Sequence, residues 1–321
     1  MEPRMKVRRA RKWKRAAYQA TALALSCCFY AGVDGSAHAT ENGATQWPVG
    51  VQTVVPAVLP APGETAFYNY TLYYHADSYK GPNGQDAIPG FDLSVFADAA
   101  RVVHTWKPKL GQLNMSSGVI LAGNNIDLIA GGASDSTFGL NFLYLTPLYL
   151  TYNTPTLHLL FGPSVFIPVG QYSVNNLANP TNNYYSFHQE LAVTYFPTKT
   201  LEISAQGGFT LNGENPDTDY LSGDTFDVDW GVNWAPFSSM PNVFIGLNGF
   251  YVQQFTDDEI NGATVGPNGN RLQKVALGAQ LIYYFSPKAG ILAKYQREFD
   301  TENGPEGDRY WIQFVTPVGA H

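Results

Sequence analysis

Cysteine is almost absent from this sequence. Of the 321 residues only Cys27 and Cys28 are cysteines, and both lie near the N-terminus. The rest of the chain therefore has no disulfide framework and no thiolate chemistry. Charge is also scarce: Asp, Glu, Lys and Arg make up 14% of the residues, whereas soluble domains contain about 25%. After residue 39 no apolar run approaches the roughly 20 residues of a spanning helix, which excludes a helical membrane protein.

Motifs for metals and cofactors are missing as well. The sequence contains no P-loop and no zinc ligand set, and its acidic stretches "NPDTD" (215–219) and "TDDE" (256–259) do not have EF-hand spacing. We expect no cofactor, no metal site and no catalytic residue. His75, Asp77 and Ser78 are the one group that suggests a hydrolase, and the sequence leaves open whether they have a chemical role.

The first 39 residues differ in composition from the rest. Eight basic residues lie within 4–15, an apolar stretch covers 16–33, and "SAHA" (36–39) offers small residues for cleavage. This pattern predicts a secretory signal peptide over 1–39, and the short, interrupted apolar stretch disfavours a retained anchor. Removing its eight basic and two acidic residues from totals of 19 and 26 leaves 11 and 24, a net charge of −13. An exported chain this acidic is a poor nucleic-acid binder, so we expect no such partner.

Alternation with period two runs through the remainder, 64–321. In "VALGAQLIYYFSPKAGILAKYQREF" (275–299) large apolar residues mostly occupy every second position on both sides of "SPK", which predicts a hairpin. The segments 187–196, 201–211 and 226–237 behave alike, and in 68–75 the aromatic Tyr68 and Tyr70 oppose Asn69 and Thr71. Phase is lost near Gly249, where we expect a bulge. About twelve such segments begin near 65, 91, 113, 137, 156, 185, 199, 225, 242, 271, 289 and 308.

The connections between these segments alternate in length. Short ones, such as "PTK" and "SPK", take turns with mostly longer ones, such as "QYSVNNLANPTNN" and "TDDEINGATVGPNGN". Antiparallel neighbours joined in this way place tight turns at one end and long loops at the other. We therefore predict an all-β, transmembrane, antiparallel up-and-down barrel of about twelve strands, with short periplasmic turns and long extracellular loops. The expected location is the bacterial outer membrane.

Aromatic residues gather beside the short connections, as an aromatic belt at a membrane interface requires. Their alternative explanation is the general preference of Tyr and Phe for strands. The aromatic residues in question are Trp106, Tyr149, Tyr152, Tyr195, Phe196, Trp234, Phe237, Tyr283 and Phe285.

The face opposite the lipid should line a pore or, in the alternative, a plugged interior. Charges are expected there because a charge facing lipid costs roughly 2–4 kcal/mol at the midplane, and such charges would set selectivity. Tyr73, Phe250 and Tyr284 could also face inward. The candidate lumen-lining residues are His188, Glu190, Asp227, Asp229, Lys294, Glu298 and Trp311.

The Pro-rich residues 40–63 precede the first strand and carry four prolines without clean alternation. Proline cannot join a ladder easily. We expect this segment either in the barrel mouth, folded inward as a plug, or as a disordered periplasmic leader.

Three stretches carry a resemblance to a known family. A resemblance to the meta-pathway phenol-degradation family of transporter-like outer-membrane proteins is carried by "WPVGV" (47–51), "PAPGETAFYNYTLYYHADSYKGPNG" (60–84) and "LGAQLIYYFSPKAGILAKYQREFDTEN" (277–303). The resemblance implies a β-barrel and a role in uptake of hydrophobic or aromatic compounds, and it implies no particular site residues.

The function expected from these features is passive uptake of small, hydrophobic or aromatic solutes through an outer-membrane channel, without enzymatic activity. An outer-membrane enzyme of the lipase kind and a structural or adhesive barrel are the alternatives. Expected partners are outer-membrane lipid, lipopolysaccharide, small solutes and the barrel-assembly machinery. The sequence does not identify the solute, the oligomeric state or whether the pore is open.

Overall fold

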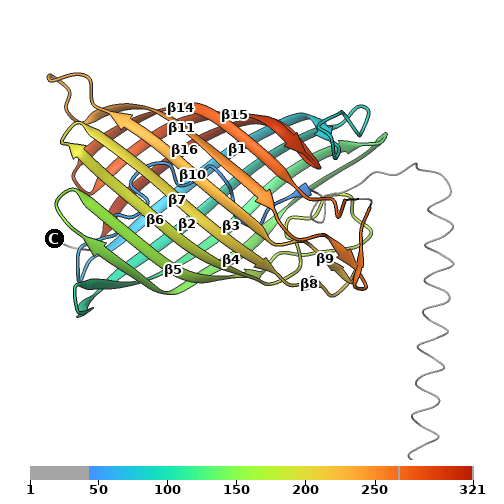
Figure 1. Ribbon diagram of the computed structural model, residues 1–321, viewed down its shortest axis with the longest axis horizontal. Coiled ribbons are helices and arrows are strands. Elements are labelled where there is room, and N and C mark those ends of the chain that lie inside the picture. Colours follow the sequence, from blue (N-terminus) through green and yellow to red (C-terminus); the bar gives the residue numbers. More distant parts are fainter. Residues whose placement is uncertain (1–42, 267, 320–321) are drawn as a thin grey trace, which may run out of the picture. The chain divides into compact units, whose positions relative to one another are not determined.

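Twelve long strands close into one antiparallel barrel in the computed structural model (Figure 1), which describes residues 43–319 except 267. Each long strand pairs with the next long strand along the chain, and the last pairs with the first. This is the up-and-down barrel that the alternating pattern predicts. The predicted signal peptide, 1–39, lies outside the described residues. The strands are β1 (Thr65–Lys80), β2 (Asp92–Leu110), β3 (Leu113–Ala130), β4 (Ala133–Asn153), β5 (Leu157–Pro168), β6 (Ser186–Thr198), β7 (Leu201–Asn212), β8 (Glu214–Asn215), β9 (Tyr220–Leu221), β10 (Thr225–Trp234), β11 (Val243–Gln254), β12 (Glu259–Ile260), β13 (Ala263–Thr264), β14 (Gln273–Ser286), β15 (Ala289–Glu302) and β16 (Gly304–Val318).

The barrel closes between β1 and β16, with Thr65 opposite Val318 and Lys80 opposite Gly304. A closed sheet leaves no strand edge unpaired, which is the condition for crossing lipid with strands. Among the described residues, no helix is long and apolar enough to cross a membrane.

Short and long connections separate to opposite ends of the barrel, as expected. The β6–β7 connection is two residues long, and the loop from β5 to β6 covers 169–185. Two connections at the long-loop end are nonetheless tight, namely those between β3 and β4 and between β15 and β16. Gly131 and Gly132 form a two-residue turn with φ of +59° and +84°, a conformation that glycine adopts readily. Four short strands, β8, β9, β12 and β13, form a small second sheet from two of the long loops.

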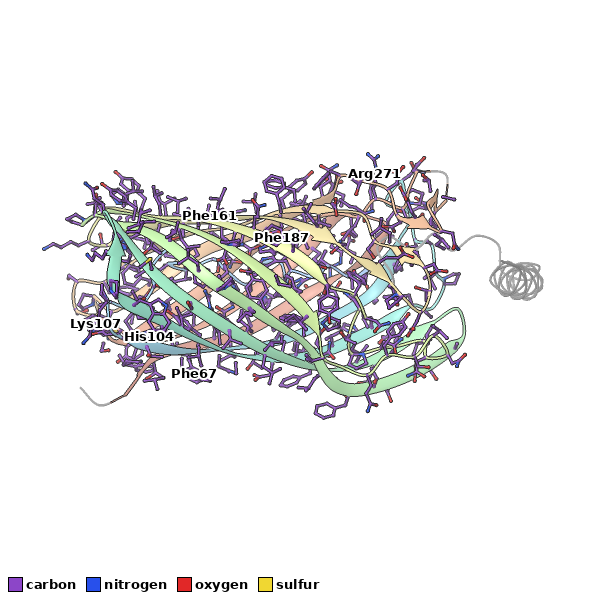
Figure 2. All side chains as sticks on the ribbon, turned by 90° about the horizontal axis from the view of Figure 1, so that it is seen from below. Phe67, His104, Lys107, Phe161, Phe187 and Arg271 are labelled. Carbon is purple, nitrogen blue, oxygen red and sulfur yellow. The ribbon has the colours of Figure 1, made fainter. Side chains whose placement is uncertain are left out.

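Alternating burial follows the alternating sequence most clearly in β10. Its Asp227, Asp229 and Asn233 are buried inside the barrel, while Trp234 on the opposite face is exposed. Figure 2 shows Phe161 and Phe187 on the outside of the barrel, and Lys107 and Arg271 at its two ends. The outer face is therefore apolar around much of the barrel, as contact with acyl chains requires.

Strand β1 has the opposite phase from the one that lipid contact would predict. Its aromatic residues Tyr70 and Tyr74 are buried inside, whereas Asn69, Thr71 and Tyr73 face outward. The expectation that Tyr73 faces inward is wrong. The reason is that the interior beside β1 is itself apolar, so the aromatic face packs there.

Two further expectations need correction. Strand β11 keeps its register through Gly249, so no bulge lies there; the outer face of Gly249 is covered by the indole of Trp230, which an added Cβ would approach to 2.8 Å. Tyr149 belongs to the interior rather than to the aromatic belt, because a register shift in β4 turns it inward. Trp106, Tyr195, Trp234, Phe237, Tyr283 and Phe285 are exposed, as a belt requires.

Candidate functional site: the barrel lumen and the segment inside it

Residues 44–59, here called the inner segment, run through the interior of the barrel (Figure 1). At the long-loop end, a Cβ added to Gly43 would lie 3.1 Å from the side chains of Tyr79 and Pro305. At the short-turn end, the Gly63 N–H donates to the carbonyl of Thr105 (2.7 Å). The inner segment therefore extends from one end of the lumen toward the other.

Two buried charges hold the backbone of the inner segment. Asp229 accepts hydrogen bonds from the N–H groups of Gly50 (2.6 Å) and Gln52 (2.9 Å). Lys294 donates to the carbonyls of Gly50 (2.5 Å) and Val51 (3.1 Å) and to Thr53 Oγ1 (3.1 Å). Hydrogen bonds to charged groups are stronger than neutral ones, at about 1.5–3 kcal/mol each. The two side chains fix the middle of the segment.

Glycine is required at position 50. Its φ is +83°, in the left-handed region that other residues rarely adopt. An added Cβ would also lie 2.4 Å from Gln296 Oε1 and 2.8 Å from the ring of Phe250. The backbone can approach the wall closely enough to reach Asp229 and Lys294 only because no side chain intervenes.

Side chains of β7, β14 and β16 also bind the inner segment along its length. Glu202 accepts from the Val55 N–H (2.9 Å), and Gln280 accepts from the Thr53 hydroxyl (2.7 Å). Gln313 donates to the Val51 carbonyl (3.1 Å). We call this side of the lumen the polar wall; it consists of Glu202, Asp229, Gln280, Lys294, Gln296 and Gln313 from β7, β10, β14, β15 and β16.

Glu298 is the centre of a buried ion network near the long-loop end. Its carboxylate lies 2.8 Å from Arg309 Nε and 3.6 Å from Lys274 Nζ, and it accepts from the Tyr74 hydroxyl (2.8 Å). Every charge in this network has an opposite partner, which is the condition for burying charge. The network joins β1, β14, β15 and β16.

The opposite side of the lumen makes few polar contacts with the inner segment. We call it the apolar wall; it consists of Leu72, Ala97, Ala99, Ile120, Ala122, Phe142 and Phe166 from β1 to β5. The inner segment turns Trp47, Val49 and Val51 into the same apolar cluster. The two walls therefore hold opposite sides of one segment by different forces.

Three cavities follow the inner segment. The outermost, of about 240 Å³, lies between Thr45 and Gln46 and the long-loop ends of β2 and β3. The middle one, of about 90 Å³, is bounded by Trp47, Val51 and the apolar wall. The innermost, of about 80 Å³, lies between 52–59 and strands β1, β14, β15 and β16. Neighbouring cavities share Asn141, or Gln52 and Tyr70, so they form a series along the lumen.

All seven residues that the sequence singles out for the lumen are buried inside the barrel, each at most 4% exposed. Asp229 and Lys294 both form hydrogen bonds with the inner segment. Trp311 donates to Gln296 (3.0 Å), and its ring lies under the Lys294 ammonium group. Glu298 lies in the separate ion network. His188 stacks on Trp47, with ring centroids 4.6 Å apart. Phe250 is buried in the lumen cluster.

Arg101 is one of the interior charges that the sequence analysis missed, together with Lys274 and Arg309 of the ion network. It donates to the hydroxyls of Tyr70 (3.2 Å) and Tyr149 (3.0 Å) on neighbouring strands. Its segment alternates less cleanly than the others, which concealed its direction. The neighbouring charge Asp98 faces outward instead and accepts from Asn69 and Thr71.

His75 faces outward, away from the lumen. Its Nδ1 lies 3.2 Å from the Ser94 hydroxyl, on the neighbouring strand, and a register shift between Ala76 and Ser78 interrupts the pairing beside it. Among the described residues, no group of three His, Cys, Asp or Glu is arranged to hold a metal ion.

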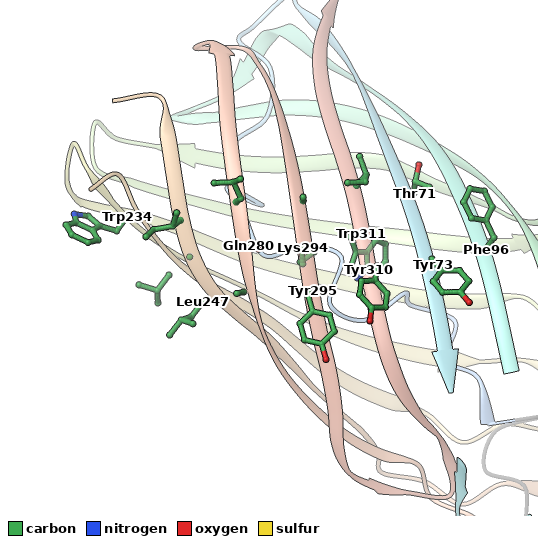
Figure 3. Close-up of a pocket in the computed structure, with 17 residues that line it drawn as sticks. Thr71, Tyr73, Phe96, Trp234, Leu247, Gln280, Lys294, Tyr295, Tyr310 and Trp311 are labelled. Atoms are coloured by element: carbon green, nitrogen blue, oxygen red, sulfur yellow. The ribbon is translucent and has the colours of Figure 1, made fainter. Parts of the chain in front are cut away.

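The outer surface carries an apolar groove of about 940 Å³ (Figure 3). It crosses β10, β11, β14, β15, β16, β1 and β2, and its floor includes Ala279 and Ala293, whose small side chains leave room. Figure 3 shows Tyr73, Tyr295 and Tyr310 on neighbouring strands along it. An apolar groove on the outer face of a barrel suits contact with acyl chains.

Comparison with known proteins places the chain in a family. Residues 76–314 match the family model described as "Putative MetA-pathway of phenol degradation". This chain belongs to that family. The family resemblance read from the sequence is thereby confirmed. Among curated proteins, none matches the sequence.

One solved structure shows the same fold, and two others match more weakly. The chain is similar to an outer membrane channel from Pseudomonas putida F1, with 17% identity and a TM-score of 0.71, over 81% of this chain and 97% of that one. It is less similar to the β domain of the Bordetella autotransporter BrkA, with 10% identity and a TM-score of 0.49 over 80% and 100%. The CymD monoaromatic hydrocarbon channel matches with 10% identity and a TM-score of 0.43 over 86% and 94%. The similarity to the Pseudomonas putida channel confirms the expected antiparallel β-barrel fold.

Proposed function

We propose that this barrel is an outer-membrane channel for passive uptake of small hydrophobic or aromatic solutes. The observation that carries the proposal is the series of three cavities along the inner segment, from the long-loop end toward the short-turn end, of which the middle one borders the apolar wall. Apolar cavities favour apolar solutes because transfer from water releases about 25 cal/mol per Å² of buried apolar surface. The membership of a phenol-degradation family supports the same solute class.

Passage requires the inner segment to shift. The middle and innermost cavities measure about 90 and 80 Å³, whereas an engineered cavity that binds benzene in another protein measures about 150 Å³. The polar wall holds the segment by hydrogen bonds, while the apolar wall offers no such bonds across the cavities. A solute therefore widens the path on the apolar side.

The solute leaves the lumen chemically unchanged in this function, so the lumen has no catalytic role. The seven interior residues act by positioning the inner segment and by setting the charge of the lumen. Lipopolysaccharide around the outer half of the barrel and the barrel-assembly machinery are the further partners that we propose.

The test is uptake of radiolabelled toluene by intact cells that do or do not produce the chain. Production should raise the initial uptake rate. Ala122→Phe fills the middle cavity from the apolar wall and should lower that rate about fivefold, the equivalent of about 1 kcal/mol. Leu121→Phe is the matched control, because Leu121 faces outward on the same strand. Equal uptake with and without the folded barrel would refute the channel.

A further inference from the structure

Two carboxylates, Glu190 and Asp227, face the lumen without a hydrogen bond to the inner segment. Glu190 on β6 and Asp227 on β10 both lie opposite Gly208 on the intervening β7. Because Gly208 has no side chain, side chains of the two neighbouring strands can lie over it. A Cβ built there would lie 2.8 Å from Asp227 Oδ1 and 2.3 Å from His188 Cε1, so these two side chains lean over Gly208.

Both carboxylates are fully enclosed and lack hydrogen bonds within 3.5 Å, and Glu190 interacts only at longer range with the Arg101 charge and the Tyr144 hydroxyl. Glu190 is 1% and Asp227 0% exposed, and among the described residues none of their four oxygens has a hydrogen-bond partner within 3.5 Å. Neither forms a salt bridge with any described residue. Burying an unpaired carboxylate costs several kcal/mol, so these two need compensation.

Two neutral side chains on β6 and β7 also have buried polar atoms without partners in the described part of the chain. Gln206, on β7, is completely buried, and neither its amide oxygen nor its amide nitrogen is hydrogen-bonded within the described part of the chain. His188 Nδ1 lies 2.9 Å from the Thr210 hydroxyl, but Nε2, the ring atom 2.9 Å from the built Cβ of Gly208, has no partner there. Trp47 covers the histidine from the side of the inner segment.

The other buried acids show that this arrangement is unusual for the barrel. Glu202 accepts from Val55, Ser204 and Asn233, and Asp229 accepts from two N–H groups of the inner segment. Unpartnered atoms of acidic, amide and imidazole groups therefore converge at one place in the lumen.

We propose that Glu190 and Asp227, with Gln206 and His188 beside them, bind a monovalent cation that keeps part of its water shell. The two carboxylates stand two strands apart, about 9–10 Å between Cα atoms at the usual spacing, and among the described residues no group of three His, Cys, Asp or Glu is arranged to hold a bare ion directly. Water between the ion and the carboxylates spans that gap, and the amide oxygen of Gln206 and Nε2 of His188 bind those waters. The site goes beyond hydrophobic-solute uptake and does not depend on it.

The test is thermal unfolding of the refolded barrel in KCl and in N-methyl-D-glucamine chloride of equal ionic strength and pH. The bulky organic cation cannot enter the site, so Tm should fall by at least about 4 °C without potassium. The double variant Glu190→Gln, Asp227→Asn should lose this dependence and should melt above the wild type in N-methyl-D-glucamine chloride. A purely structural pair would instead lower Tm equally in both salts.

Glu202→Gln is the matched control, since Glu202 is a buried acid with three partners; it should leave the potassium dependence intact. A wild-type Tm that is equal in the two salts would overturn the proposal and indicate that protons neutralise the pair. A crystal of the wild-type barrel soaked in thallium(I) provides a readout if the double variant does not fold. An anomalous peak between Glu190 and Asp227 is expected, and its absence at that place contradicts the cation site. Toluene uptake is scored separately, so failure of one proposal leaves the other standing.

Discussion

The two walls of the lumen hold the same inner segment in different ways. The polar wall binds its backbone through Asp229, Lys294 and four further side chains, with fixed distances and directions. The apolar wall meets Trp47, Val49 and Val51 through contacts without direction, and cavities remain between them. Hydrogen bonds to charged groups are lost steeply when atoms move, whereas apolar contacts tolerate repacking. The difference indicates that a solute can displace the inner segment on the side of the apolar wall.

Removal of the inner segment should produce the largest change. Deletion of residues 44–59 leaves the pairing of β1 with β2 and β16 intact, so the barrel should still close. The lumen would lose both the segment and the hydrogen bonds that hold it. We expect single-channel conductance to rise at least about tenfold, measured in planar bilayers. An unchanged conductance in a folded barrel would show that the segment does not obstruct the lumen.

Release of the segment from the polar wall should have an intermediate effect. In the double variant Asp229→Asn, Lys294→Met, five hydrogen bonds to the segment lose their charged partner, each worth about 1.5–3 kcal/mol. The segment should become cleavable by chymotrypsin at Trp47 in the folded barrel, and conductance should rise by a smaller factor than on deletion. The control is Thr210→Val, since Thr210 contacts His188 and not the segment.

Resistance of the double variant to cleavage, at the level of the wild type, would mean that the apolar wall alone fixes the segment. The comparison between the walls would then be reversed. The same protease assay applied to Thr210→Val reports whether loss of an interior hydroxyl by itself loosens the lumen.

The architecture was accessible from the sequence because lipid imposes period two on every strand. β10 shows this directly: its acids face inward and its indoles outward. The inward face of β1 could not be assigned in this way, since an aromatic face packs equally well against lipid or against an apolar lumen. What decided its direction was the presence of Trp47 and Val51 inside the barrel.

The place of the inner segment could not be predicted either. It has no periodic pattern, and its hydrogen bonds join residues such as Gly50 and Asp229 that are 179 positions apart. Local propensity carries no information about such partners. Asp229 and Lys294 were recognisable as interior charges from their strand faces, but their shared target was not.

The smallest effect is expected from a change in the apolar wall. Phe166 packs on Tyr144 and Phe142, with ring centroids 4.6 and 4.9 Å away, and none of its atoms hydrogen-bonds the inner segment. Phe166→Leu should cost about 1–2 kcal/mol of stability, because part of a buried ring is removed. It should leave the segment resistant to chymotrypsin and the conductance unchanged, while toluene uptake rises by less than about threefold. If this substitution instead exposed Trp47 to the protease, packing on the apolar wall would be holding the segment as firmly as the charges opposite, and the path of the solute would have to lie elsewhere.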